Sequence, residues 1–187
     1  MTLRGSFLAI DFETATTARA SACALGYAHV VDGVLAASGS TLIDPRLPAE
    51  AWCFTDVHGI TPQDVVGAPT FSEVWAELHA RFGDELLVAH NAAFDVGVAQ
   101  AELQRAGVHP ITPLRYRCSA ALARLAWPAA PRVTLAHLTS TLGIPLNHHD
   151  AGSDARACAE VLLRAADALG VPHFAALPDV WRMARAA

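Results

Sequence analysis

The sequence predicts an α/β fold, with a mixed five-stranded sheet flanked by helices. Two observations support this prediction. The N-terminal part contains three apolar, strand-like segments in succession, two of them joined by a tight turn. The rest of the chain alternates short apolar strands with segments of helical periodicity. A meander followed by alternating strands and helices indicates one domain whose sheet has mixed strand directions.

The meander is expected to contain three strands, at residues 6–11, 22–31 and 34–43. Asp32-Gly33 forms the tight hairpin turn between the second and third strands. The stretch 48–69 has no clear periodicity, although Thr61-Pro62 within it is typical of the start of a short helix. This part of the chain is therefore predicted to be mostly strand, followed by an irregular connection.

The clearest helix begins after Thr70. Thr70 and Glu73 have the spacing of a capping box, the apolar residues that follow recur at helical spacing, and Gly83 marks the end. Thr134 and Ser153 are the expected N-caps of two later helices. The remaining strands are expected at 85–90 and 114–117, and the remaining helices at 94–106, 118–126, 135–142, 154–169 and 178–187.

The composition describes a globular protein. The chain has 187 residues, 53% of them hydrophobic and 17% charged, so we expect a single domain over 1–187 with its motif-bearing core at about 6–170. No apolar run approaches the roughly 18 residues of a membrane span, and the N-terminus lacks the layout of a secretory signal. A cytoplasmic protein with no membrane partner is expected. The four cysteines form no C-x-x-C pair, which favours buried, reduced thiols.

Charge neither favours nor excludes a nucleic-acid partner. The formal net charge is −5 and the sequence pI is about 5.9, whereas nucleic-acid-binding domains usually carry a basic face. However, a cluster of carboxylates that binds two divalent cations gains their positive charge. All thirteen basic residues are arginine, whose forked side chain makes bidentate phosphate contacts, although genome composition also produces such a bias.

Three acidic elements stand at the ends of predicted strands or the starts of predicted helices. Asp11 and Glu13 close the first strand, where alternation points both side chains to the same side. Asp95 begins the helix after the fourth strand, and Asp154 lies in the first turn of the last long helix. Taken singly, each has a plain alternative, such as a solvated strand end or a helix cap.

Taken together, these acids can meet at one edge of the sheet. His149, in the loop that leads to Asp154, has no comparable structural reason to be there. Hydrolysis of a phosphodiester bond needs this set, because carboxylates hold two metal ions about 4 Å apart and a base deprotonates the attacking water. Oxygen ligands of this kind suit Mg²⁺ or Mn²⁺. The sequence therefore predicts a two-metal hydrolytic site.

Three short motifs contain these residues: Asp11-Phe12-Glu13-Thr14, Asn91-Ala92-Ala93-Phe94-Asp95 and His149-x-x-x-x-Asp154-Ala155. They resemble the motifs of the histidine subclass of DEDD-superfamily 3′–5′ exonucleases, which includes ribonuclease T and the proofreading epsilon subunit of bacterial DNA polymerase III. Counting from His148 would leave five intervening residues, so His149 is the match. The segment around His58 also resembles the epsilon-like branch. The resemblance covers about residues 6–170 and implies a ribonuclease H-like fold.

The resemblance also implies a role for each motif residue. The catalytic candidates are Asp11, Glu13, Asp95 and Asp154, which would hold two Mg²⁺ or Mn²⁺ ions, and His149, which would be the general base. The candidate substrate-binding residues are Phe12, Thr14, His58, Asn91 and Phe94. Structural interpretations stay open for four of these: a turn contact for Thr14 and His58, bracing of its loop for Asn91, and core packing for Phe94.

Residues outside the motifs have two interpretations. Trp52 and Phe54 can stack on bases or cover the core. Arg115, Arg117 and Arg132 are candidate phosphate contacts or solvated surface residues. The remaining polar candidates, His79, His90, His137 and Asp150, are expected to be turn or surface residues.

The implied function is hydrolysis of phosphodiester bonds at the 3′ ends of nucleic acids to give 5′-mononucleotides, with DNA slightly preferred and the strand single. An exoribonuclease, or an oligonucleotide or dinucleotide hydrolase, would use the same motifs. A non-catalytic nucleic-acid-binding subunit is the alternative from another class, and the intact metal set argues against it. The chain ends about 17 residues past Gly170 and contains no clamp-binding peptide, so DNA repair or nucleotide salvage is expected rather than tethered proofreading.

Overall fold

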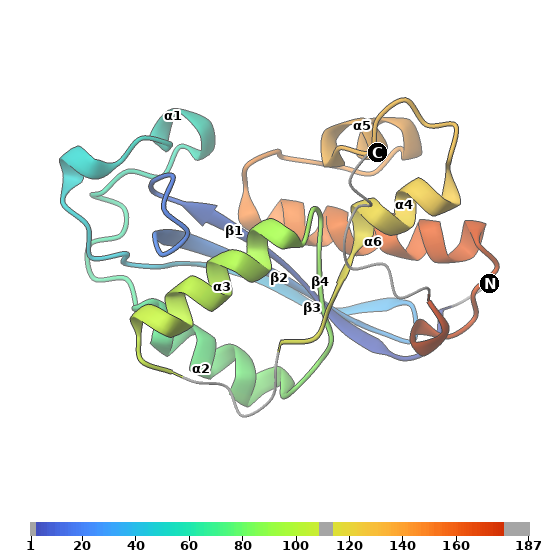
Figure 1. Cartoon of the computed structure of the whole chain (residues 1–187), viewed down its shortest axis with the longest axis horizontal. Helices are drawn as coiled ribbons and strands as arrows, with labels where there is room; N and C mark the ends of the chain where they lie inside the picture. Colours follow the sequence, from blue (N-terminus) through green and yellow to red (C-terminus); the bar gives the residue numbers. More distant parts are fainter. Residues whose placement is uncertain (1–2, 109–113, 178–187) are drawn as a thin grey trace.

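The computed structural model describes residues 3–108 and 114–177 of the chain (Figure 1). Its centre is a sheet in the order β3-β2-β1-β4-β5. β1 pairs antiparallel with β2, which pairs antiparallel with β3, whereas β4 pairs parallel with both β1 and β5. The expected mixed five-stranded sheet is therefore confirmed. The strands are β1 (Ser6–Thr14), β2 (Ala22–Val31), β3 (Val34–Leu42), β4 (Leu87–Ala89) and β5 (Tyr116–Cys118).

Helices flank this sheet, as expected. They are α1 (Thr55–His58), α2 (Phe71–Phe82), α3 (Ala93–Arg105), α4 (Ser119–Ala126), α5 (Leu135–Leu142) and α6 (Ala151–Ala168), with short 3₁₀ turns at Ala49–Ala51 and Phe174–Ala176. In Figure 1, α2 and α3 lie beside each other, as do α4 and α6. The helix predicted at 178–187 lies outside the described residues.

Most predicted helix ends are confirmed, and α6 is the exception. The capping box of Thr70 and Glu73 opens α2, and Thr134 and Gly143 bound α5. The N-cap of α6 is Asp150, not Ser153, because the Asp150 carboxylate accepts the backbone N–H of Ser153 at 2.7 Å. The helix therefore starts one turn earlier than predicted.

Two stretches near the sheet also differ from prediction. β1 continues to Thr14, because its last residues still pair with β2. No helix follows Thr61-Pro62; Thr61 instead bonds the Asp64 carboxylate through its N–H and hydroxyl at 2.8 and 2.7 Å, which closes a turn. The short helix α1 lies just before it, in a stretch predicted to be irregular.

Alternate residues of β1 enter two packed layers. Ile10 and Phe12 join the core cluster that contains Phe71 of α2, and the Phe12 and Phe71 ring centroids lie 6.1 Å apart. Phe7 and Ala9 join the cluster that contains the apolar side of α6. The next residues on this second side are Asp11 and Glu13, so the packing of β1 already directs both carboxylates toward α6.

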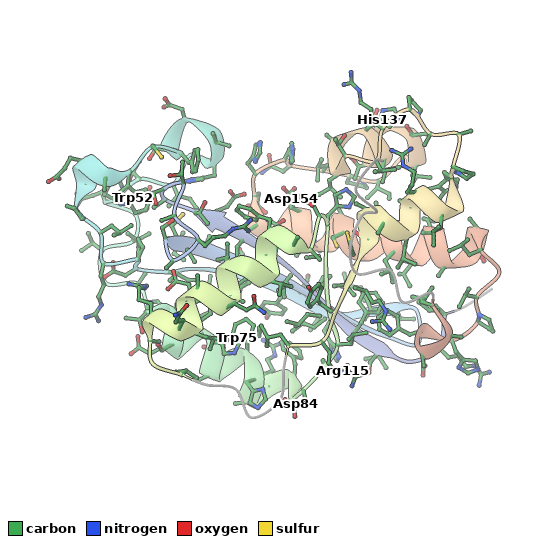
Figure 2. The ribbon with its side chains drawn as sticks, viewed as in Figure 1. Trp52, Trp75, Asp84, Arg115, His137 and Asp154 are labelled. Carbon is green, nitrogen blue, oxygen red and sulfur yellow. The ribbon has the colours of Figure 1, made fainter. Side chains whose placement is uncertain are left out.

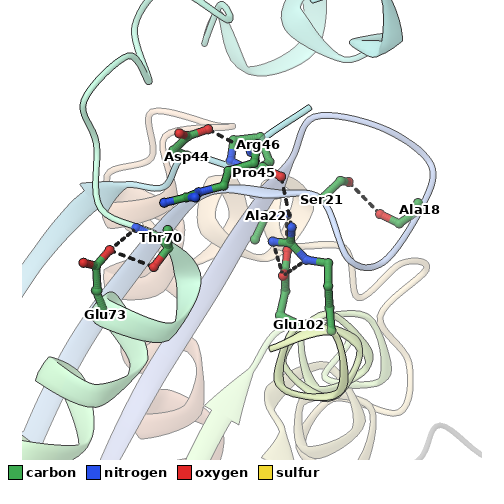
Figure 3. Close-up of polar contacts among 10 residues, drawn as sticks. Ala18, Ser21, Ala22, Asp44, Pro45, Arg46, Thr70, Glu73 and Glu102 are labelled. Atoms are coloured by element: carbon green, nitrogen blue, oxygen red, sulfur yellow. Dashed lines mark hydrogen bonds and ion pairs between the residues drawn. The ribbon is translucent and has the colours of Figure 1, made fainter. Parts of the chain in front are cut away.

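An ion pair between the buried Glu102 and the exposed Arg105 fixes α3 against the start of β2 (Figure 3). Glu102 is fully buried; one of its oxygens accepts the N–H of Ala22 at 2.9 Å, and the other accepts Arg105 at 2.9 and 2.7 Å. Arg105 also donates to the carbonyl of Pro45 at 3.1 Å. Because both oxygens are satisfied, this charge is tolerated in the core and holds α3 at a fixed angle to the sheet.

Among the residues that the structure describes, no helix is both long and apolar enough to span a bilayer. Cys23, Cys118 and Cys158 are buried free thiols, as expected, but Cys53 is exposed in the connection that precedes α1.

Candidate active site

One cleft, of about 670 Å³, is lined by every residue that the sequence motifs singled out. These residues are Asp11, Phe12, Glu13, Thr14, His58, Asn91, Phe94, Asp95, His149 and Asp154. They come from the end of β1, from α1, from the turn into α3 and its first turn, and from the first turn of α6 and the loop that precedes it. The other residues that line the cleft are Phe54, Val57, His90, Ala120, Val133, Thr134, Leu135 and His148.

Three carboxylates converge at the centre of this cleft. Asp11, Glu13 and Asp154 each offer an oxygen, and these oxygens lie within 4.8 Å of one another. Asp154 is 3% exposed and lies near the middle of the molecule in Figure 2. Its Oδ2 accepts the backbone N–H of His149 at 3.1 Å, whereas its buried Oδ1 has no hydrogen-bond partner among residues 3–108 and 114–177.

Asp95 has a different place in the cleft. Its Oδ1 accepts the backbone N–H of Phe12 at 3.0 Å, which ties the first turn of α3 to β1. The side chain is 2% exposed, and its charge acts on that of Asp11. Asp95 therefore lies beside the group of three carboxylates and is not part of it.

Burial and mutual repulsion make the charged forms of these acids unfavourable. Burial, and then the charges of Asp95 and Asp154, raise the pKa of Asp11 well above its ordinary value. The same causes, burial first, raise the pKa of Glu13 to about 8. For Asp95, burial raises the pKa to about 7 against the opposing effect of the Phe12 N–H. Positive charge brought into this group would therefore favour the ionised forms of Asp11 and Glu13 at neutral pH.

The residues present fit a divalent cation. The unpartnered Oδ1 of Asp154 is the key observation, because a buried acceptor without a donor costs free energy that a bound cation would recover. Three carboxylate oxygens at this spacing are the hard ligands that Mg²⁺ and Mn²⁺ prefer. Asp11, Glu13 and Asp154 can therefore hold a metal ion.

The pH dependence of stability is expected to report this arrangement. In metal-free protein, Glu13 keeps its proton up to about pH 8 when folded, but loses it near 4.5 when unfolded. The folded state therefore binds more protons across this range, and the free energy of unfolding falls as pH rises. The histidines with lowered pKa, such as His90 and His149, give the opposite slope only below 6.5.

The clean window is thus pH 6.5 to 8, where each extra proton contributes up to about 1.4 kcal/mol per pH unit. Urea unfolding in EDTA measures the slope. We expect a shallower slope in Glu13→Gln and a flat or reversed one with saturating Mn²⁺. A metal-free protein that becomes more stable from pH 6.5 to 8 would contradict this interpretation of the carboxylates.

The two adjacent histidines have different contacts. The ring of His148 donates from Nδ1 to Oδ2 of Asp154 at 3.0 Å, whereas His149 reaches that oxygen only through its backbone N–H. The two rings stack, with centroids 4.0 Å apart and planes at 17°. His149 has a left-handed backbone with φ of 69°, and burial, together with the neighbouring His148, lowers the pKa of its ring.

His148 is a contact that the motifs did not predict. The spacing to Asp154 selects His149, and only the fold reveals that the ring of its neighbour lies against the same carboxylate. The adjacency of two histidines before the helix was the available signal. The stacked rings of His148 and His149 are nearly parallel, and one nitrogen of each lies within 4.8 Å of the other and of an Asp154 oxygen.

His58 braces one wall of the cleft. Its Nδ1 accepts the N–H of Ile60 at 3.0 Å, so the neutral ring carries its proton on Nε2 and donates to the carbonyl of Thr14 at 3.2 Å. Burial lowers the pKa of His58, which favours this neutral form. The bonds connect α1 to the end of β1, so the turn contact considered for His58 and Thr14 exists in a cleft-lining position.

Asn91 and Phe94, both from the second motif, have different surroundings. Asn91 has a left-handed backbone with φ of 66°, and its carbonyl accepts the N–H of Phe94 at 2.9 Å, so its backbone shapes the start of α3. Phe94 is 37% exposed and therefore does not pack in the core. Phe12 is buried beneath the cleft, with its ring against Phe71.

The aromatic and arginine residues outside the motifs, which had two interpretations each, differ in whether they line the cleft. Phe54 lines the cleft, whereas Trp52 packs against the small cluster of Ala15, Cys23 and Val65. None of Arg115, Arg117 and Arg132 is among the described cleft-lining residues, and Figure 2 shows Arg115 well away from Asp154.

His90 lies in a turn, as one of its two expected positions, but it is half-buried and its ring is held by hydrogen bonds. Its Nε2 donates to the carbonyl of Val133 at 2.7 Å and its Nδ1 accepts the hydroxyl of Ser119 at 2.8 Å. Burial lowers its pKa to about 4, so the ring is neutral. It connects the end of β4 to the segment before α5, and thereby supports the cleft wall that contains Val133.

The chain that forms this site matches a known protein family. The family model described as an exonuclease (RNase_T) matches residues 8–162. The chain belongs to this exonuclease family. The match begins within β1 and ends within α6, so it includes all the segments that supply the carboxylates.

The curated relatives are much longer than this chain, and the similarity covers a small part of each. The chain is 37% identical over 139 residues to the PolC-type DNA polymerase III of Clostridium perfringens, which covers 74% of this chain and 9% of the polymerase. It is 33% identical over 176 residues to the putative bifunctional exonuclease/endonuclease protein MT2247 of Mycobacterium tuberculosis, covering 87% of this chain and 27% of that protein. The chain thus spans less than a third of either relative.

Solved structures share the fold. Exonuclease X in complex with 5′-overhanging duplex DNA is similar with a TM-score of 0.69 and 26% identity, covering 88% of this chain and 93% of that chain. Exonuclease I is similar with a TM-score of 0.72 and 21% identity, covering 89% and 43%. The expected ribonuclease H-like fold class is confirmed.

Proposed function

We propose that this exonuclease-family chain is a two-metal-dependent 3′–5′ exonuclease that hydrolyses phosphodiester bonds at nucleic-acid 3′ ends and releases 5′-mononucleotides. One observation carries the proposal: the buried carboxylates of Glu13 and Asp154 and the half-buried one of Asp11 converge in a cleft next to a half-buried histidine, and one Asp154 oxygen has no partner among the described residues. Phosphodiester hydrolysis needs this combination, because charge builds on the phosphate oxygens while a water molecule loses its proton.

Each acid contributes from a rigid element. Asp11 and Glu13 on β1 and Asp154 on α6 would hold one ion, and Asp11 together with Asp95 would serve the second. When bound, such ions lower the pKa of a coordinated water and stabilise the charge of the transition state. The N–H of Phe12 keeps Asp95 in place, and the N–H of His149 keeps Asp154 in place.

His149 would take the proton of the attacking water. Its ring borders the cleft and forms no side-chain hydrogen bond among those found in the described residues, so its nitrogens face the substrate space or solvent. Its lowered pKa keeps the imidazole neutral, and thus basic, at neutral pH. His148 instead uses its ring to hold Asp154.

DNA is the preferred substrate in this proposal, and a single 3′ strand is the preferred form. The likeness to exonuclease X, whose structure contains 5′-overhanging duplex DNA, supports the choice of DNA. RNA and dinucleotides stay as alternatives, because no described side chain in the cleft identifies a reader of the sugar. A non-catalytic binding subunit is disfavoured, since it would keep mutually repelling buried acids without using them.

Digestion of end-labelled strands tests the proposal. Purified protein with Mg²⁺ or Mn²⁺ should shorten 5′-labelled single-stranded DNA progressively from the 3′ end, release mononucleotides with a 5′-phosphate, and stop when EDTA is added. Matched RNA and dinucleotide substrates in parallel reactions rank the alternatives. Intact DNA, RNA and dinucleotides in the presence of Mn²⁺ would exclude the enzymatic function.

A glycine of β2 provides a structural test of the same site. Gly26 lies opposite Asp11 in the sheet, and a Cβ at this position would lie 1.8 Å from the carbonyl oxygen of Ala151. Gly26→Ala should therefore push the first turn of α6 away from β1 and separate Asp154 from Asp11. We expect turnover to fall by roughly 10²-fold, which a displacement of about 1 Å can cause, and stability to fall by about 1–3 kcal/mol.

The matched control is Gly152→Ala, whose added Cβ would meet the Ser40 side chain at 3.2 Å and Oδ1 of Asp150 at 3.5 Å, but no backbone atom at close range. Thermal melts and 3′-end hydrolysis of both variants measure the effect. A Gly26→Ala protein as active as the control would show that the close approach of α6 to β2 does not position the carboxylates.

A further inference from the structure

Arg19, which none of the motifs includes, lies against a cleft residue. It belongs to the loop between β1 and β2, and its guanidinium carbon lies 4.7 Å above the centroid of the Phe94 ring. Its Nη1 also donates to the carbonyl of Phe94 and, at 3.3 Å, to that of Ala93. One side chain thus contacts both the ring and the backbone of Phe94.

The first turn of α3 is shaped to receive this guanidinium. Gly97 lies one turn after Ala93, and a Cβ there would lie 3.1 Å from Nη1 and 3.2 Å from the guanidinium carbon of Arg19. A larger residue at this position would displace Arg19. The absence of a side chain at position 97 therefore allows the flat guanidinium to lie between α3 and the ring of Phe94.

Phe94 needs such support. A phenyl ring that is 37% exposed has little packing to hold one rotamer, and fixing it costs side-chain entropy. Phe94 is among the described residues that line the cleft and Arg19 is not, so the ring, rather than the guanidinium stacked on it, borders the cleft. The exposed part of the ring borders the cleft that Asp95 and Thr14 also line.

We propose that Arg19 is a positioning residue that holds Phe94 as a flat platform, on which the base of the 3′-terminal nucleotide stacks. The inference rests on the proposed exonuclease function, and its new element is Arg19, since Phe94 is already a candidate substrate-binding residue; stacking on Phe94 would recognise a base by its face rather than its edge. Every base has such a face, so this contact would accept all four. Arg19 would act only through Phe94.

The arrangement suits Arg better than Lys. A guanidinium is planar and can stack on the ring while its N–H groups reach two carbonyls, whereas an ammonium is a compact, strongly hydrated charge. It also carries a positive charge close to the acids, and this charge lowers the pKa of Asp95. The effect of Arg19 on the pKa of Asp95 does not depend on the terminal base. A substrate without a terminal base therefore separates this electrostatic effect from the positioning of Phe94.

The experiment compares two single strands that differ only in the last residue, one with a normal 3′-terminal nucleotide and one with an abasic terminal sugar. For the wild type, kcat/KM should favour the normal end by about 5- to 100-fold, the worth of one stacked base. Phe94→Ala should bring this ratio close to one. Arg19→Met should lower it at least threefold, mainly through KM, and Arg19→Lys should restore part of it.

Two further variants keep the test independent of folding. Gly97→Val retains both Arg19 and Phe94 but displaces their contact, at little change in helix propensity, and should lower the same ratio. Arg164→Met removes an exposed arginine that pairs with Glu160 on α6, and should leave the ratio unchanged. Circular dichroism and thermal melts confirm that each variant is folded.

Stacking can also be measured without catalysis. A strand with 2-aminopurine at its 3′ end should lose fluorescence on binding to the wild type in Ca²⁺, and lose less of it on binding to Arg19→Met. An unchanged abasic ratio and unchanged quenching in Arg19→Met would overturn the inference. A second result would also overturn it: Arg19→Met lowers kcat/KM equally on both substrates, and the slope of log binding constant against log salt concentration falls by about one. That result would make Arg19 a phosphate contact. Quenching by a wild type that cleaves nothing would instead reject the proposed function alone.

Discussion

Asp154→Asn is expected to abolish metal-dependent hydrolysis while making the metal-free protein more stable. Turnover should fall by roughly 10³-fold or more, because the loss of a ligand removes several kcal/mol of metal stabilisation from the transition state. Stability should rise because the substitution removes one charge from a buried group of acids that repel each other. Opposite signs for activity and stability are the signature of a functional charge rather than a structural one.

The design of this experiment follows from the contacts of Asp154. Asparagine keeps an oxygen that can accept the N–H of His149, so the entry to α6 should remain intact. The matched control is Asp150→Asn, which removes the same charge four residues earlier and leaves a residue that caps a helix equally well.

Melting temperatures with EDTA and with Mn²⁺, together with initial rates, measure both effects. The wild type and Asp150→Asn should be stabilised by Mn²⁺, and Asp154→Asn should respond little. If Mn²⁺ stabilised Asp154→Asn as strongly as the wild type, Asp154 would not be a metal ligand.

The sequence was sufficient for elements whose ends are determined locally. Thr70 with Glu73, and Thr134 with Gly143, bound helices because capping residues and the left-handed glycine act within one turn. The predicted start of α6 was wrong because Asp150 and Ser153 are both good N-caps in one polar segment. Only the hydrogen bond between them decides which residue is the cap. Local rules do not rank such competing neighbours.

The candidate site followed from the sequence to the extent that secondary structure dictates direction. Alternation along β1 put Asp11 and Glu13 on one side, and this side is the one that α6 covers. The contacts of Arg19 with Phe94 and of Glu102 with Ala22 could not be predicted, because they join residues far apart in the chain. Such contacts depend on how α3 lies against the sheet, which no local pattern specifies.

His149→Ala is expected to lower turnover by roughly 10²–10⁴-fold, the usual weight of a general base. Metal binding should survive, because the contact of residue 149 with Asp154 is made by the backbone N–H, which alanine retains. Stabilisation of the variant by Mn²⁺ should therefore equal that of the wild type. The acid limb of the kcat/KM profile, which should lie below pH 6.5 because the pKa of His149 is lowered, should also disappear.

His148→Ala is the matched comparison, because it removes an adjacent imidazole that contacts Asp154 through its ring. If His148 only steadies Asp154, its loss should lower turnover less than tenfold, weaken the response to Mn²⁺ and leave the acid limb in place. The two variants therefore separate proton transfer from ligand positioning by opposite patterns in rate and metal response. A larger loss of turnover in His148→Ala than in His149→Ala, with the acid limb lost, would assign the base to His148 and show that the ring in contact with the carboxylate, rather than motif spacing, identifies it.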